Sequence, residues 1–310
     1  MQGLELYAPR EPRHRRTWSV AAVVLAIVFI VVGQVIGVLP GMLLGYITPT
    51  GQSVGWMGTV FMLLSFAAIA ALVVLWVLFF ERRSLTAIGF NGSGLRRFLR
   101  GYAVGLAFLI AVVGGIALLG GYRVDGGGVF TGAALAGAVV PILALMIGFI
   151  VQGSTEEIVT RGWLMQVIAS RHGLGIAVAV SSLLFGLLHI LNTEPSPQLF
   201  MGVLNVTLYG VAMGLYAARE GSLWGVCGWH AAWNWLLGVG FGLEVSGQPI
   251  EVTPLVIDLG YRVEIPWWIT GADFGPEGGV VTSAALILFS AWLFWTGRRY
   301  GYGIEAEKPL

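Results

Sequence analysis

Residues 18–39 read WSVAAVVLAIVFIVVGQVIGVL, a stretch of 22 residues without a charged side chain. A helix needs about 20 consecutive apolar residues to cross the hydrocarbon core of a bilayer. Comparable stretches recur along the chain, and we predict spans at 18–39, 56–80, 98–119, 131–151, 174–191, 199–218, 223–243 and 280–295. The sequence therefore predicts an all-α protein, a polytopic bundle of about eight transmembrane helices.

The composition supports a membrane protein. Apolar residues make up 57% of the chain and charged residues 11%, whereas a soluble domain usually carries about 25% charged residues. The single cysteine, Cys227, excludes an internal disulfide and a multi-cysteine metal site. Small residues four apart, such as Gly101 and Gly105, predict close packing within one bundle. We expect membrane lipids as partners and no nucleic acid. The sequence leaves the oligomeric state open.

Basic residues predict the orientation of the bundle, because cytoplasmic loops carry an excess of Lys and Arg. With the N-terminus inside, 15 of the 17 basic residues fall on the cytoplasmic side, and the remaining two are Arg123 and Arg262. We therefore predict a multi-pass protein of the cell membrane with both termini in the cytoplasm. It would comprise a basic tail at 1–17, a single transmembrane bundle at 18–297 and a second tail at 298–310.

One connection is long. The segment at about 244–279 is predicted to lie outside the membrane on the extracytoplasmic side. We expect an ordinary solvated loop there, and a cap over the bundle is the alternative.

Ionisable side chains gather in three apolar segments, where each costs roughly 2.5–3.5 kcal/mol at a helix centre and so indicates function. The first segment holds Glu156, Glu157 and Arg161. Glu157 and Arg161 are four apart and can pair, whereas Glu156 projects about 100° away. Glu157 is then expected to stay ionised, and Glu156 is suited to act as a general base. The alternative is a helix end in the headgroup zone, where both acids meet water.

The other two segments hold His189 and the pair His230 and Asn234, which lie four apart on one helix face. Interhelical hydrogen bonding would explain any one of them. Together they suit hydrolysis, with Glu156 taking a proton from water, His189 orienting that water, and the second pair donating to an oxyanion. Alternatively, Glu156, His189 and His230 could hold a metal such as zinc.

These residues resemble the intramembrane proteases for CAAX processing and bacteriocin processing, called CPBP or Abi proteins, which include the Ras-converting CAAX endopeptidases. The family motifs are E-E-x-x-x-R, F-x-x-x-H and H-x-x-x-N. The chain has them in that order, as Glu156-Glu157 with Arg161, Phe185 with His189, and His230 with Asn234. The motifs span about 153–237, and a weaker likeness extends from about residue 83 to the end of the last span.

The resemblance implies an endopeptidase that cleaves a membrane-presented peptide or a protein's C-terminal tail, lipidated in the CAAX case. Glu156 would activate water with the help of His189, and His230 and Asn234 would stabilise the oxyanion. Glu157 and Arg161 would position the site, within a catalytic core at about 148–242. No cofactor follows with certainty. Zinc stays open, because metal-dependent and metal-independent mechanisms are both argued for the family and H-E-x-x-H is absent. The alternative functions are a proton-coupled transporter and a non-catalytic scaffold of the same fold.

The predicted spans place Glu156 and His189 at different depths in the membrane. If the fourth span is 131–151, Glu156 lies at its cytoplasmic end, whereas His189 lies 15 residues into the next span, roughly 22 Å deeper. We therefore prefer a helix at about 148–170 that carries Glu156 through the membrane. A kinked or re-entrant stretch would then surround Pro141.

Overall fold

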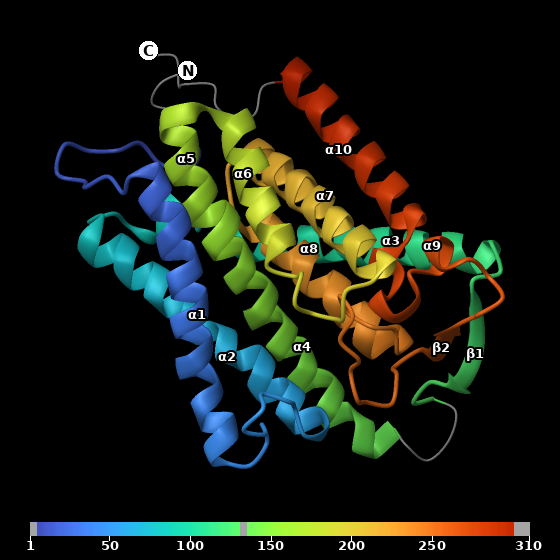
Figure 1. The fold of residues 1–310 in the computed structure, drawn as a ribbon. Helices are drawn as coiled ribbons and strands as arrows, with labels where there is room; N and C mark the ends of the chain where they lie inside the picture. Colours follow the sequence, from blue (N-terminus) through green and yellow to red (C-terminus); the bar gives the residue numbers. More distant parts are fainter. Residues whose placement is uncertain (1–4, 131–134, 301–310) are drawn as a thin grey trace.

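The computed structural model describes residues 5–130 and 135–300 as a bundle of helices (Figure 1). The helices are α1 (Ser19–Leu43), α2 (Gly55–Leu75), α3 (Gly94–Leu118), α4 (Leu135–Glu157), α5 (Met165–His172), α6 (Leu174–Leu187), α7 (Pro197–Glu220), α8 (Trp224–Trp235), α9 (Trp267–Thr270) and α10 (Val280–Tyr300). Within the described chain the only sheet is the antiparallel pair of β1 (Tyr122–Gly127) and β2 (Ile257–Tyr261). The predicted all-α class is confirmed.

Six helices of the described chain are long and apolar enough to cross a membrane. They lie at 19–43, 55–80, 94–118, 137–172, 197–220 and 280–297. Two further predicted spans correspond to shorter helices: α6 has 14 residues, and α8 has 12 and continues as a π-helix over Leu236–Gly240. Each predicted span thus matches a helix, and the protein is a polytopic membrane protein.

The fourth predicted span is part of one longer helix. α4 runs without interruption through a π-helical segment, Ile158–Leu164, into α5. The helix that carries Glu156 is therefore long and apolar enough to cross the membrane, in agreement with the preferred alternative. Of the kinked or re-entrant stretch expected around Pro141, the re-entrant alternative is wrong, because Pro141 lies inside α4. An irregular backbone exposed to lipid would leave several N–H and C=O groups without hydrogen bonds. A proline within a continuous helix leaves only a few such groups unpaired. Residues 131–134 of the predicted span lie outside the described part.

Helix packing divides the bundle into two groups. α4 packs on α2 and α8, and α8 packs on α3, whereas α6 packs on α7, and α7 packs on α10. α5 and α6 form a hairpin that turns at Gly173, whose φ of 81° suits glycine. Beyond that turn, α4 diverges from α6 and α7 (Figure 1). A cavity lies between these two groups.

The predicted close packing at small residues is present between α3 and α8. A Cβ atom on Gly105 would lie 2.6 Å from the Trp229 carbonyl oxygen, and one on Gly101 would clash with the Gly225 carbonyl. The two backbones are therefore in direct contact. These glycines hold α8, and with it His230 and Asn234, against α3.

The N-terminal segment, predicted as a basic tail, is packed against the bundle from residue 5 onward. The Leu6 amide donates to Gln166 Oε1 (3.0 Å), and the Tyr7 hydroxyl donates to the Arg161 carbonyl (3.2 Å). Arg83, 4% exposed, donates to Glu5 (3.2 Å). Acidic, aromatic and aliphatic side chains among the arginines make this docking favourable. The positive charge of the segment therefore did not predict that it packs on the bundle.

The segment at 244–279, expected to be an ordinary solvated loop, forms a wall of the bundle. β2 pairs with β1, and Phe274 is 1% exposed. Asn205 on α7 donates to the carbonyls of Glu277 (2.7 Å) and Gly279 (2.9 Å). The solvated-loop prediction is therefore wrong. The alternative of a cap is closer, because Val245 and Glu277, from the two ends of the segment, line a cavity together with helical residues.

Candidate active site

A buried carboxylate, Glu157 at the end of α4, connects three helices. Its Oε1 atom accepts hydrogen bonds from Arg161 Nη1 (3.1 Å), His230 Nδ1 (2.9 Å) and the Tyr209 hydroxyl (3.4 Å). Both Glu157 and Arg161 are 0% exposed. The predicted pairing of these two residues is present, and it also orients His230.

The Arg161 guanidinium completes this inner layer. It lies 4.4 Å from the centroid of the Phe185 ring and 5.7 Å from that of Tyr209, and it donates to the Thr160 hydroxyl (2.8 Å). The orientation prediction counts Arg161 among the basic residues on the cytoplasmic side. The structure corrects this, because it lies within a helix and its charge is compensated by Glu157.

Glu156 points away from this inner layer, as the 100° step predicts, and lines a cavity of about 780 Å³. Its side chain is 18% exposed. A π-helical segment begins directly after Glu157, and another follows Asn234 at the end of α8. Such segments are frequent at functional sites, where the wider turn shifts the side chains that follow it.

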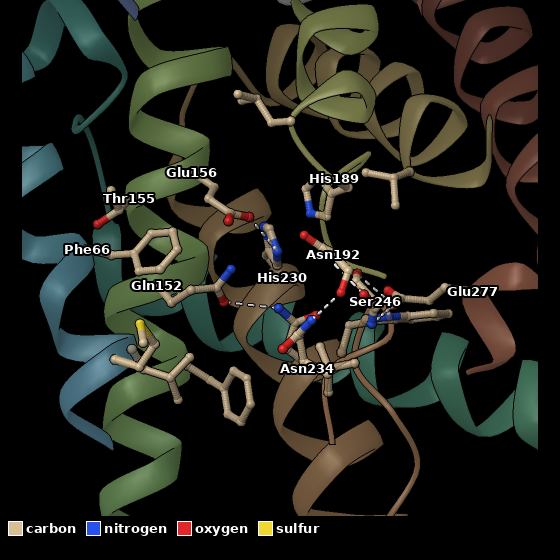
Figure 2. A pocket seen from close by; sticks show the side chains of 18 of the residues that line it. Phe66, Gln152, Thr155, Glu156, His189, Asn192, His230, Asn234, Ser246 and Glu277 are labelled. Atoms are coloured by element: carbon tan, nitrogen blue, oxygen red, sulfur yellow. Dashed lines mark hydrogen bonds and ion pairs between the residues drawn. The ribbon is translucent and has the colours of Figure 1, made fainter. Parts of the chain in front are cut away.

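Glu156, His189, His230 and Asn234 all line the cavity. Figure 2 shows Glu156 and His189 on opposite sides of it, with His230 between them and Asn234 further along α8. The structure therefore brings together four of the six predicted residues at one water-accessible space. The other two, Glu157 and Arg161, lie behind it.

His189 does not lie within a helix, contrary to its prediction inside a span at 174–191. α6 ends at Leu187, and His189 occupies the turn that follows. Its Nδ1 atom donates to the Phe185 carbonyl (2.9 Å). In the neutral imidazole this assigns the proton to Nδ1 and leaves Nε2 as an acceptor.

The predicted difference in depth is resolved by the α5–α6 turn. Glu156 lies 16 residues before His172, and His189 lies 15 residues after Leu174. At about 1.5 Å per residue, both are roughly 22–24 Å from the turn. Because the two helices run in opposite directions from the same end, the two side chains reach the same depth.

His230 lies between both acids. Its Nδ1 atom contacts Glu157, and its Nε2 atom lies 3.4 Å from Glu156 Oε2. A carboxylate accepts hydrogen bonds and does not donate them. A protonated His230 would offer an N–H group to each acid, whereas the neutral ring would offer only one.

Several polar residues of the cavity were missed by the sequence reasoning. Gln152 lies four residues before Glu156 on the same helix face, and its Oε1 atom accepts from Asn234 Nδ2 (3.0 Å). Its spacing in an apolar segment was a usable signal. Glu277 accepts from the Trp233 indole (2.8 Å) and the Ser246 hydroxyl (2.8 Å). Nothing in its local sequence indicates that it reaches the cavity, because it lies far along the chain in the 244–279 wall.

The proposed metal ligands do not fit a metal site in this arrangement. Across residues 5–130 and 135–300, no three His, Cys, Asp or Glu side chains are grouped so that they could hold an ion. Glu156 and His230 are neighbours, but the third ligand, His189, belongs to the opposite wall. Cys227 is buried and free.

Comparison with known protein families gives a match over about a third of the chain. Residues 136–236 match the family described as type II CAAX prenyl endopeptidase Rce1-like. This range contains all six predicted site residues. No curated protein and no solved structure matches the chain.

Proposed function

Because residues 136–236 match the type II CAAX prenyl endopeptidase Rce1-like family, we propose that the protein hydrolyses peptide bonds with Glu156 as its general base. The observation that carries this proposal is the position of Glu156, which lines the cavity beside His230 while its neighbour Glu157 stays fully buried. Two adjacent acids thereby take different roles, one chemical and one positional.

In the first step, Glu156 takes a proton from a water molecule whose oxygen attacks the scissile carbonyl carbon. His189 helps to orient that water, because its Nε2 atom is an acceptor when Nδ1 donates to the Phe185 carbonyl. The products of this step are a protonated Glu156 and a tetrahedral intermediate with a negatively charged oxygen.

His230 and Asn234 stabilise that oxygen. Protonation of Glu156 removes the charge that holds His230 Nε2–H, so this donor becomes available to the oxyanion. Asn234 uses one amide hydrogen for Gln152 Oε1 and offers its second to the same oxygen. A donor of this kind typically contributes a factor of about 10²–10³ to kcat. Glu156 then passes its proton to the leaving amine as the C–N bond breaks.

Charge balance supports this assignment. Arg161 compensates the buried Glu157 at 3.1 Å, and an uncompensated charge at that position would be costly. Glu157 and Arg161 are positioning residues, which hold His230 through the bond to Nδ1 (2.9 Å). No step is assigned to a metal, because the residues present do not fit one.

The substrate is a peptide or a protein tail presented at the membrane, with a CAAX-type sequence as the first class to test. The purified protein in nanodiscs would be incubated with a pooled peptide library that includes farnesylated CAAX peptides. Glu156→Gln removes the base and keeps the shape of the side chain. Loss of a general base should lower kcat by about 10²–10⁴.

The control is Glu264→Gln, which changes an exposed acid outside this cavity. Cleavage by the wild type and by Glu264→Gln, but not by Glu156→Gln, would support the proposal. Cleavage by Glu156→Gln at the wild-type rate would overturn it. Proton-coupled uptake without cleavage would instead favour the transporter alternative.

A further inference from the structure

The cavity has one polar, exposed end. Its lining there comes from Gly51, Gln52 and Ser53 in the connection between α1 and α2, and from Gln248 and Glu251 in the 244–279 wall. All five residues are exposed. Polar side chains at an exposed rim indicate that this end meets water, and we call it the mouth.

The opposite end is closed by buried side chains. The cavity stops at Val159, Thr160 and Phe185, which are all buried. Behind them Arg161 lies against the Phe185 ring, and Trp163 is 1% exposed. Tyr7 of the docked N-terminal segment covers the Arg161 carbonyl from the far side. No described residue of the N-terminal segment or the α5–α6 turn lines the cavity.

The closed end lies on the predicted cytoplasmic side. Without Arg161, which lies inside a helix, 16 basic residues remain for the topology, and 14 of them are on the predicted cytoplasmic side. They include Arg171 at the end of α5, beside the turn to α6. The connection 44–54, which contributes to the mouth, has no charged residue. In Figure 1 this connection lies at the lower edge and the α5–α6 turn at the upper edge.

We propose that the cavity admits its substrate from the extracytoplasmic side of the membrane. The side of access follows from the cavity alone, whereas the class of substrate rests on the proposed peptidase function. Among the membrane-presented substrates considered above, this favours secreted or surface-exposed peptides and the outer tails of membrane proteins over lipidated tails on the cytoplasmic leaflet, which would meet the closed end. Polypeptide on the outer side reaches Glu156 and His189 through the mouth without passing the buried layer.

The side of the mouth can be measured without any substrate. Cys227 is the single cysteine and is 1% exposed, so Cys227→Ala provides a cysteine-free background. Gln52→Cys and Glu251→Cys each place a thiol at the mouth, and Arg96→Cys places one at the exposed start of α3 on the basic side. A membrane-impermeant maleimide is applied to right-side-out and to inverted vesicles, with denatured protein as the reference for full labelling.

We expect Gln52→Cys and Glu251→Cys to react in right-side-out vesicles and Arg96→Cys only in inverted ones. The reverse pattern would overturn the proposal, and so would mouth cysteines that stay unreactive until the protein is denatured. A bulky maleimide at Gln52→Cys should also abolish cleavage, whereas the same label at Arg96→Cys should leave it unchanged. If the cysteines react as expected but no peptide is cleaved, the side of access is upheld. Only the proposed peptidase function is then contradicted.

Discussion

Replacing Glu157 by glutamine is the most direct test of the buried layer behind the cavity. Three donors from three helical segments, on Arg161, Tyr209 and His230, converge on one oxygen of this side chain. Glu157→Gln keeps the shape and an acceptor oxygen but removes the charge. The Arg161 guanidinium then remains buried without its acid.

The expected loss of stability follows from burial. Both members of the ion pair are 0% exposed, and the N–O distance is 3.1 Å. Removing one partner of a fully buried pair typically costs about 3–5 kcal/mol, because the remaining charge is uncompensated. Arg161→Met in the same chain removes that remaining charge. The double variant should therefore lose less than the sum of the two single losses, with a coupling of roughly 0.5–3 kcal/mol.

The assay is equilibrium unfolding in mixed micelles, followed by tryptophan fluorescence, for the wild type, both single variants and the double variant. The Glu264→Gln variant serves as the control, because its pair with Arg262 is long, at 3.7 Å, and exposed. That variant should unfold at the wild-type midpoint. A Glu157→Gln midpoint equal to the wild type, or strictly additive losses in the double variant, would refute the reasoning.

Two further outcomes are expected. Gly101→Ala should destabilise the protein by about 1–3 kcal/mol, because its Cβ atom would clash with the Gly225 carbonyl, and the unfolding midpoint should fall. Gly114→Ala in the same helix is the matched control, since nothing lies within 4 Å of a Cβ there; an equal loss at both positions would contradict the close α3–α8 contact. Peptide cleavage should be unchanged by a strong chelator, since the described residues group no three metal ligands; inactivation reversed by added zinc would show that the site rearranges to bind a metal.

Local sequence patterns were sufficient for the helices and for individual pairs of residues. The apolar stretches predicted every long helix, because a membrane helix must be apolar over a length that the bilayer sets. The i, i+4 spacing predicted the Glu157–Arg161 ion pair, and the 100° step predicted that Glu156 would face another direction. Both are properties of one helix, and they do not depend on its neighbours.

Contacts between distant segments were beyond such patterns. The sequence placed His189 inside a helix, whereas the turn after α6 carries it. Gln152 and Glu277 lie 125 residues apart and line one cavity, and the docking of Tyr7 on the Arg161 carbonyl joins residues 154 apart. Each of these depends on how helices of similar apolar character pack, which hydrophobicity alone does not distinguish.

The sequence by itself determined that this chain is a membrane bundle and which of its residues could carry chemistry. Those features follow from composition, helical periodicity and the cost of charge in lipid, all of which are local. Only the tertiary structure decided the common depth of Glu156 and His189, the two carboxylates around His230, and the end at which the cavity opens. Those features follow from where the α5–α6 turn lies and how α4 diverges from it, since a cavity exists only between helices that have already packed.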